Sequence, residues 1–179
     1  MNIINGFGNI FYNYNYDEEY DENYDDNYDE NYDEEVNDSR FYKKNTMVFI
    51  DAESVAANRG TRIIGQCRNI GEIYEIRYYA RQKDPSTEAW KDVAKEYGIK
   101  PILMCGEARH NKIDEKIIKD IYNVLENNKA IDIFCIASRD GDFSNIAKEL
   151  RDRHKRVVVL ATKNTSTRLK SQASEIKGI

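Results

Sequence analysis

Five short apolar runs, separated by amphipathic stretches, constrain the fold more than any other feature of this chain. The runs cover residues 47–50, 73–80, 99–104, 131–137 and 157–161. Runs of this length, apolar on both faces, are typical of strands buried in a parallel sheet. The stretches between them have the apolar spacing of helices with one buried face. The sequence therefore predicts a three-layer α/β sandwich with a mostly parallel five-stranded sheet.

Four helices are expected between these strands, over residues 59–69, 84–97, 112–126 and 143–153. Asp84 followed by Pro85 is a typical helix start, because proline lacks the N–H that the first helical turn leaves unpaired. Gly71 and Gly98 are expected to end the first and second helices.

Charge divides the chain into two unlike parts. Residues 1–38 hold 13 of the 32 acidic residues and no Lys or Arg, so they carry −13, while the remaining residues carry +8. From Tyr16 to Tyr32 a tyrosine recurs every fourth residue among Asp, Glu and Asn. With so few aliphatic residues this segment cannot bury enough surface to offset its ordering entropy. We therefore predict a disordered acidic tail over residues 1–44 and one folded domain over residues 45–179.

Two roles are open for the tail. It is either a solubilising extension or a mimic of nucleic acid, which alternates aromatic rings with negative charge. In the second role it would loosely shield a basic rim on the folded domain. Deleting residues 1–38 should then tighten RNA binding at low salt, with a difference that shrinks as salt rises.

The remaining composition indicates a soluble cytoplasmic protein. No apolar run approaches the roughly 20 residues of a membrane helix, and the first residues lack the basic region of a secretory signal. The three cysteines form no C-x-x-C pair and are expected to be reduced thiols. A homo-oligomer is compatible with this sequence.

Acidic residues fall at positions that one edge of the predicted sheet would bring together. Asp51 closes the first strand, Asp140 and Asp142 follow the fourth, and Asp114 lies at the start of the helix before the fourth strand. An Asp at a helix start is often only a cap for backbone N–H groups. Four carboxylates in one place, however, repel one another unless a cation is present. Hard oxygen ligands suit Mg²⁺ or Mn²⁺, which can activate water against a phosphodiester without a His or Cys nucleophile.

Three ordered blocks of sequence resemble a known family. They are Val48-Phe-Ile-Asp-Ala-Glu-Ser54, Lys112-Ile-Asp114 and Ser138-Arg-Asp-Gly-Asp-Phe143, followed by Lys155-Arg-Val-Val-Val159. Over residues 46–174 the chain resembles the NYN domain, in the LabA-like branch of the PIN-like nucleases. The resemblance implies a PIN-like fold and a metal-dependent ribonuclease. Its acidic positions match Asp51, Asp114, Asp140 and Asp142.

Other residues around these blocks are candidates for binding the substrate. Ser54 stands where the family usually has Asn, and Arg139 where it often has Gly. With Ser138 and the basic Arg109 and Lys112, they form the predicted substrate-binding set around the acidic centre. Further basic residues follow the first block at Arg59, Arg62 and Arg68, and the aromatic candidates for stacking on bases are Tyr78, Tyr79 and Trp90, for which core packing is the stronger expectation.

We therefore expect a metal-dependent endoribonuclease that acts on RNA, most simply single-stranded RNA. A first alternative is a catalytically weak RNA-binding or regulatory module that kept the fold, an idea that rests on Ser54. A second is a metal-dependent phosphatase with Asp51 as nucleophile and Glu53 as the acid two residues later.

Overall fold

The computed structural model describes residues 43–105 and 111–179. Its elements, in chain order, are β1 (Asn45–Asp51), η1 (Ala57–Arg59), α1 (Gly60–Ile70), β2 (Glu72–Arg81), α2 (Pro85–Tyr97), β3 (Lys100–Met104), α3 (Asn111–Asn127), β4 (Ile131–Ala137), η2 (Gly141–Phe143), α4 (Ser144–Asp152), β5 (Arg156–Ala161), α5 (Thr167–Lys170) and β6 (Glu175–Gly178). The predicted acidic tail lies outside the described residues, except for Lys43 and Lys44.

The strands form one sheet in the order β3-β2-β1-β4-β5-β6, and every neighbouring pair is parallel. This confirms the predicted α/β class. The sheet has six strands, however, and the sequence predicts five. The additional strand, β6, is short and lies at an edge, and its Ile176 is 49% exposed. It therefore lacks the apolar run by which the other strands are recognised.

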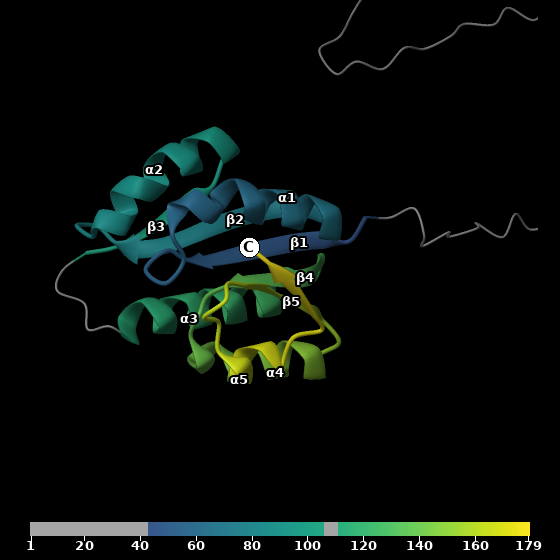
Figure 1. The fold of residues 1–179 in the computed structure, drawn as a ribbon. Helices are drawn as coiled ribbons and strands as arrows, with labels where there is room; N and C mark the ends of the chain where they lie inside the picture. The colour runs from purple at the N-terminus through teal and green to yellow at the C-terminus, as the bar shows by residue number, and fades with distance from the viewer. Residues whose placement is uncertain (1–42, 106–110) are drawn as a thin grey trace, which may run out of the picture. The chain divides into compact units, whose positions relative to one another are not determined.

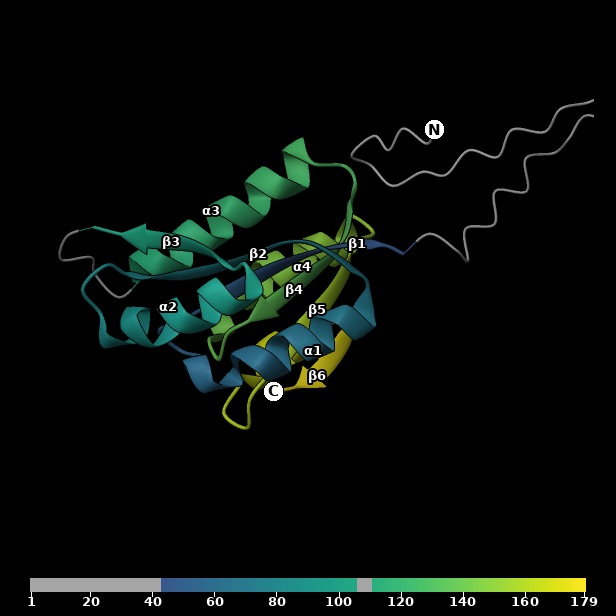
Figure 2. The same ribbon diagram turned by 90° about the horizontal axis from the view of Figure 1, so that it is seen from above.

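Helices cover both faces of the sheet, which gives the predicted three layers (Figures 1 and 2). Alternate residues of β1 enter two separate cores: Val48 and Ile50 pack with α1 and α2, whereas Met47 and Phe49 pack with α3 and α4. This alternation follows from the two-residue period of a strand. Burial on both faces explains why the sequence of β1 reads as a continuous apolar run.

The aromatic candidates for base stacking are part of these cores. Tyr78 and Trp90 stack on each other with ring centroids 5.8 Å apart, and Tyr79 packs beside Phe49. Tyr78, Tyr79 and Trp90 are at most 2% exposed, so the expectation of core packing is confirmed. The Trp90 indole N–H also donates to the carbonyl of Val55, 3.1 Å away, which fixes the loop after β1.

The predicted boundaries of α2 are confirmed by its caps. The Asp84 side chain accepts a hydrogen bond from the backbone N–H of Ser86 at 2.9 Å, and Pro85 occupies the first turn. Gly98 ends the helix with a φ of 67°, a left-handed conformation that glycine adopts without steric cost. No helix in the described part of the chain is long and apolar enough to cross a membrane.

The strand order places a crevice at the carboxyl ends of the central strands, which form one edge of the sheet. From β1 the chain builds outward through β2 and β3, and it then returns to β4 on the other side of β1. At such a reversal, the connections leaving the two central strands diverge to opposite faces and leave room between them. Asp51 ends β1 at this edge, and the segment 138–142 leaves β4 beside it.

Candidate active site

Asp51 is held in a fixed orientation at the end of β1. The residue is 5% exposed. One oxygen, Oδ1, accepts hydrogen bonds from the backbone N–H groups of Glu53 and Ser54, both at 3.2 Å. The other, Oδ2, accepts one from the hydroxyl of Ser138 at 2.8 Å. The turn after β1 and the end of β4 therefore both fix this side chain.

Two serines join the loops that follow β1 and β4. Besides donating to Asp51, the Ser138 hydroxyl accepts the backbone N–H of Asp140 at 3.1 Å. The Ser54 hydroxyl accepts the backbone N–H of Arg139 at 3.2 Å and lies 3.3 Å from the Ser138 hydroxyl. Serine at position 54, where the family usually has asparagine, thus still links the two loops.

Asp140 has a local structural role as well as a place at the site. Its Oδ1 accepts the backbone N–H of Asp142 at 2.9 Å and caps the short helix η2. The cap of η2 is therefore Asp140, and Asp142 lies within the helix. Both residues are exposed, so neither carboxylate is sequestered from a ligand in the crevice.

Asp114, in the first turn of α3, belongs electrostatically to the same group. It is half-buried, and burial raises its pKa to about 7 from its ordinary value of 3.8, with further contributions from the charges of Asp51, Asp140, Asp142 and Glu53. Because each neighbouring carboxylate opposes its ionisation, the other three predicted acids lie within electrostatic reach of Asp114.

The chemistry of this donor set fits a hard divalent cation. Carboxylate oxygens are the ligands that Mg²⁺ and Mn²⁺ prefer, and a cation would relieve the repulsion that raises the pKa of Asp114. Within residues 43–105 and 111–179, however, no three His, Cys, Asp or Glu side chains converge closely enough to hold a metal as they lie. The four carboxylates would therefore have to move closer to one another to form such a site.

Glu53 is a fifth acidic residue near the crevice, but it is engaged by a cation. Its Oε1 accepts hydrogen bonds from the Arg81 side chain at 2.6 Å and from the Arg81 backbone N–H at 3.3 Å. Arg81 also pairs with Asp84, the cap of α2, at 3.0 Å. Glu53 therefore ties the loop after β1 to the start of α2.

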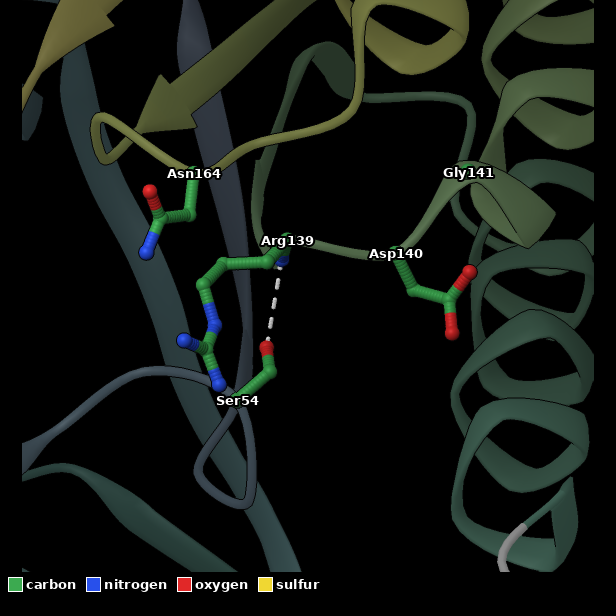
Figure 3. Close-up of a pocket in the computed structure, with 5 residues that line it drawn as sticks. All are labelled: Ser54, Arg139, Asp140, Gly141 and Asn164. Carbon is green, nitrogen blue, oxygen red and sulfur yellow. Dashed lines mark hydrogen bonds between the residues drawn. The ribbon is translucent and has the colours of Figure 1, made fainter.

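A pocket of about 370 Å³ adjoins the carboxylates. It is lined by Ser54, Arg139, Asp140, Gly141 and Asn164. These residues follow β1, β4 and β5, three neighbouring strands of the sheet (Figure 3). Asn164 was not predicted as a site residue, because the loop 162–166 carries no motif and only the adjacency of β5 to β4 brings it here.

The predicted basic residues separate into two groups. Arg139 is exposed and lines the pocket, and Lys112 is exposed in the first turn of α3, while Arg109 lies outside the described residues. By contrast, Arg59 donates to the carbonyl of Ile179 at 2.5 Å and Arg62 to that of Gly178 at 3.1 Å. These two arginines hold the chain around β6, a contact that occupies at least one donor of each side chain.

Comparison with known proteins agrees with the fold. A solved structure of a protein of unknown function from Vibrio parahaemolyticus, VPA0982, is similar with a TM-score of 0.65 and 20% identity, covering 78% of this chain and 94% of that one. At this identity the likeness concerns the fold alone. A comparison with curated proteins finds no significant match. The NYN domain matches residues 45–177, from the first residue of β1 to β6. This chain therefore belongs to the NYN domain family, within the PIN-like nuclease superfamily.

Proposed function

We propose that this protein is a metal-dependent endoribonuclease that hydrolyses phosphodiester bonds of single-stranded RNA. The observation that carries the proposal is the charge of Asp51, Asp140 and Asp142 acting on Asp114 at the strand reversal: it adds to the effect of burial, and together they raise the pKa of Asp114 to about 7. Membership of a nuclease superfamily supports the same reaction class.

Asp51, Asp140, Asp142 and Asp114 are the residues that would hold Mg²⁺ or Mn²⁺. The metal would supply an activated water and neutralise charge on the phosphate. The protein's own contribution is orientation: three hydrogen bonds fix Asp51, and the Ser138 hydroxyl joins that carboxylate to the backbone of Asp140. Such preorganisation avoids the cost of arranging ligands during the reaction.

Substrate binding is assigned to the polar and basic residues around this centre. Lys112 and Arg139 are exposed cations that can neutralise phosphates. Ser54 and Ser138 connect the two loops beside which the RNA would lie. Arg109 completes the predicted set by its position in the sequence.

Phosphatase chemistry is the less supported alternative. It requires the acid two residues after Asp51 to exchange a proton with a leaving group. That acid is Glu53, and its ion pair with Arg81 at 2.6 Å gives its carboxylate a structural role between the loop after β1 and β2.

The proposal is tested with labelled single-stranded RNA and p-nitrophenyl phosphate, each incubated with the full chain in Mn²⁺ or in EDTA. We expect RNA to be cleaved only in Mn²⁺, and p-nitrophenyl phosphate to remain intact. Asp51→Asn should lower cleavage by orders of magnitude and leave RNA affinity nearly unchanged, because the basic residues remain. Asp152→Asn, which changes an exposed acid on α4, is the matched control.

RNA binding without metal-dependent cleavage would instead support the regulatory module. Ser54→Asn is then the informative variant, because asparagine restores the residue usual in the family and adds a second polar group.

A further inference from the structure

The pocket beside the carboxylates has the composition of a subsite for a polar anion. Its wall includes a guanidinium from Arg139, an amide from Asn164 and a hydroxyl from Ser54. Among the described residues no ion pair engages the Arg139 guanidinium, and the side chain is exposed. A cation in a concave site beside an unpaired amide can bind a phosphate and hydrogen-bond a second group of the same ligand.

Arg139 and Asp140 are consecutive, yet their side chains serve different sides of the crevice. In Figure 3 the Arg139 guanidinium points toward Ser54, with Asn164 on the neighbouring loop, whereas the Asp140 carboxylate points away toward α3. Asp114 lies on α3. A phosphate held by the four carboxylates would therefore lie beside the pocket, and Asp140, which also lines the pocket, borders both.

The loop that carries Asn164 is fixed to the end of β4. The backbone N–H of Ser166 donates to the carbonyl of Arg139 at 3.0 Å, and the buried Thr165 hydroxyl lies 3.4 Å from the carbonyl of Ser138. Gly141 allows this approach, because a Cβ there would lie 2.9 Å from the Ser166 hydroxyl. Asn164 and Arg139 therefore belong to one connected unit, although 24 residues separate them in sequence.

We propose that Arg139, Asn164 and Ser54 form a subsite for the nucleotide next to the scissile phosphate. Arg139 binds the phosphate of that nucleotide, and the Asn164 amide binds its 2′-hydroxyl or the edge of its base. The inference rests on the proposed ribonuclease function and names the residues that select the flanking nucleotide. An amide is suited to this selection because it offers both a donor and an acceptor. Binding to the 2′-hydroxyl would also distinguish RNA from DNA at this position.

Binding is measured with the full chain in EDTA, by fluorescence anisotropy of a short labelled single-stranded RNA. Arg139→Ala should weaken binding about tenfold and reduce the salt dependence by about one phosphate contact. Asn164→Ala should weaken binding roughly three- to tenfold and leave the salt dependence unchanged, because it removes a neutral hydrogen bond. Arg68→Ala and Asn69→Ala, at exposed positions on α1, make the same chemical changes elsewhere.

A second measurement locates the nucleotide. RNAs with a single 2′-deoxy nucleotide or a single changed base are cleaved in Mn²⁺, one position at a time. With the wild-type protein, we expect one position next to the cleaved bond to respond more than the others. Asn164→Ala should abolish that response and leave the response at the other positions unaltered. If the role of Asn164 were purely structural, the variant would lower cleavage of all the substituted RNAs alike.

The possible outcomes separate the subsite from the chemistry. If wild-type protein cleaves RNA in Mn²⁺ and both variants bind as the controls do, the subsite is wrong and the nuclease stands. If no cleavage occurs but Arg139→Ala and Asn164→Ala still weaken binding, the nuclease is wrong and a nucleotide-binding pocket stands. If Asn164→Ala lowers cleavage of all the substituted RNAs equally, the selective role of that residue is overturned.

Discussion

Replacing Asp114 by asparagine should stabilise the metal-free protein at alkaline pH. Burial and the neighbouring carboxylates raise the pKa of Asp114 to about 7 from 3.8. The folded state therefore binds this proton more tightly than the unfolded state. Below the pKa of Asp114 in the unfolded state, the free energy of unfolding is undiminished. It falls as pH rises between the unfolded and folded pKa values, and the loss is complete above pH 7.

The magnitude follows from the size of the shift. Three pKa units correspond to about 4 kcal/mol. Asp114 is only half-buried, and solvent screening reduces this to about 2 kcal/mol. Asparagine has nearly the same shape and no charge, so it should recover that amount at pH 8. For a domain of this size the melting temperature should rise by roughly 6 °C.

The assay is urea and thermal unfolding of the full chain in EDTA at pH 8 and pH 4. We expect the gain from Asp114→Asn at pH 8 and little gain at pH 4, where the carboxyl of the folded wild type is protonated. Glu115→Gln is the matched control, since Glu115 lies in the same helical turn but is exposed. A variant no more stable than wild type at pH 8, or equally stabilised at both pH values, would refute the raised pKa of Asp114.

Three further predictions test the surroundings of the site. Millimolar Mn²⁺ should raise the melting temperature of the wild type by linkage, and Asp140→Asn should lose much of this response in thermal scans while its amide oxygen still caps η2. Ser138→Ala should lower the free energy of unfolding by about 1–3 kcal/mol in urea titrations, because Asp51 loses a buried hydrogen-bond donor; an unchanged value would show that this contact contributes nothing. Tyr79→Phe should lower the free energy of unfolding by about 1 kcal/mol in the same assay, because the buried Tyr79 hydroxyl donates to Asp120 at 3.1 Å. Burial and Asp120 raise the pKa of that hydroxyl. Tyr74→Phe, at an exposed position, should leave the free energy of unfolding almost unchanged.

The sequence predicts those elements whose burial requires an almost entirely apolar composition. β1, β4 and β5 are covered on both faces, so their residues are almost all apolar. β6 was missed because only its pairing with β5 and the contacts of Arg62 and Gln66 with the Gly178 carbonyl define it. All of these contacts are made to the backbone of β6, so they leave no pattern in its own sequence.

The candidate site was predictable to a similar degree. Asp51 and Asp140 could be placed together because each follows a buried strand, and parallel strands end at one edge. The function of a basic residue was harder to predict from charge alone: Arg62 holds the Gly178 carbonyl, whereas Arg139 lines the pocket. Asn164 required the strand order, which places β5 next to β4.

The attachment of the loop 162–166 has a consequence for protein engineering. Its hold on β4 comes from the backbone of Ser166 and the hydroxyl of Thr165, while Lys163 and Asn164 at its tip are exposed. Exchanging the tip side chains should therefore leave folding intact, since substitutions at exposed positions usually change stability by less than about 0.5 kcal/mol. A library randomised at positions 163 and 164 would sample new ligand preferences on an unchanged scaffold, without touching the carboxylates.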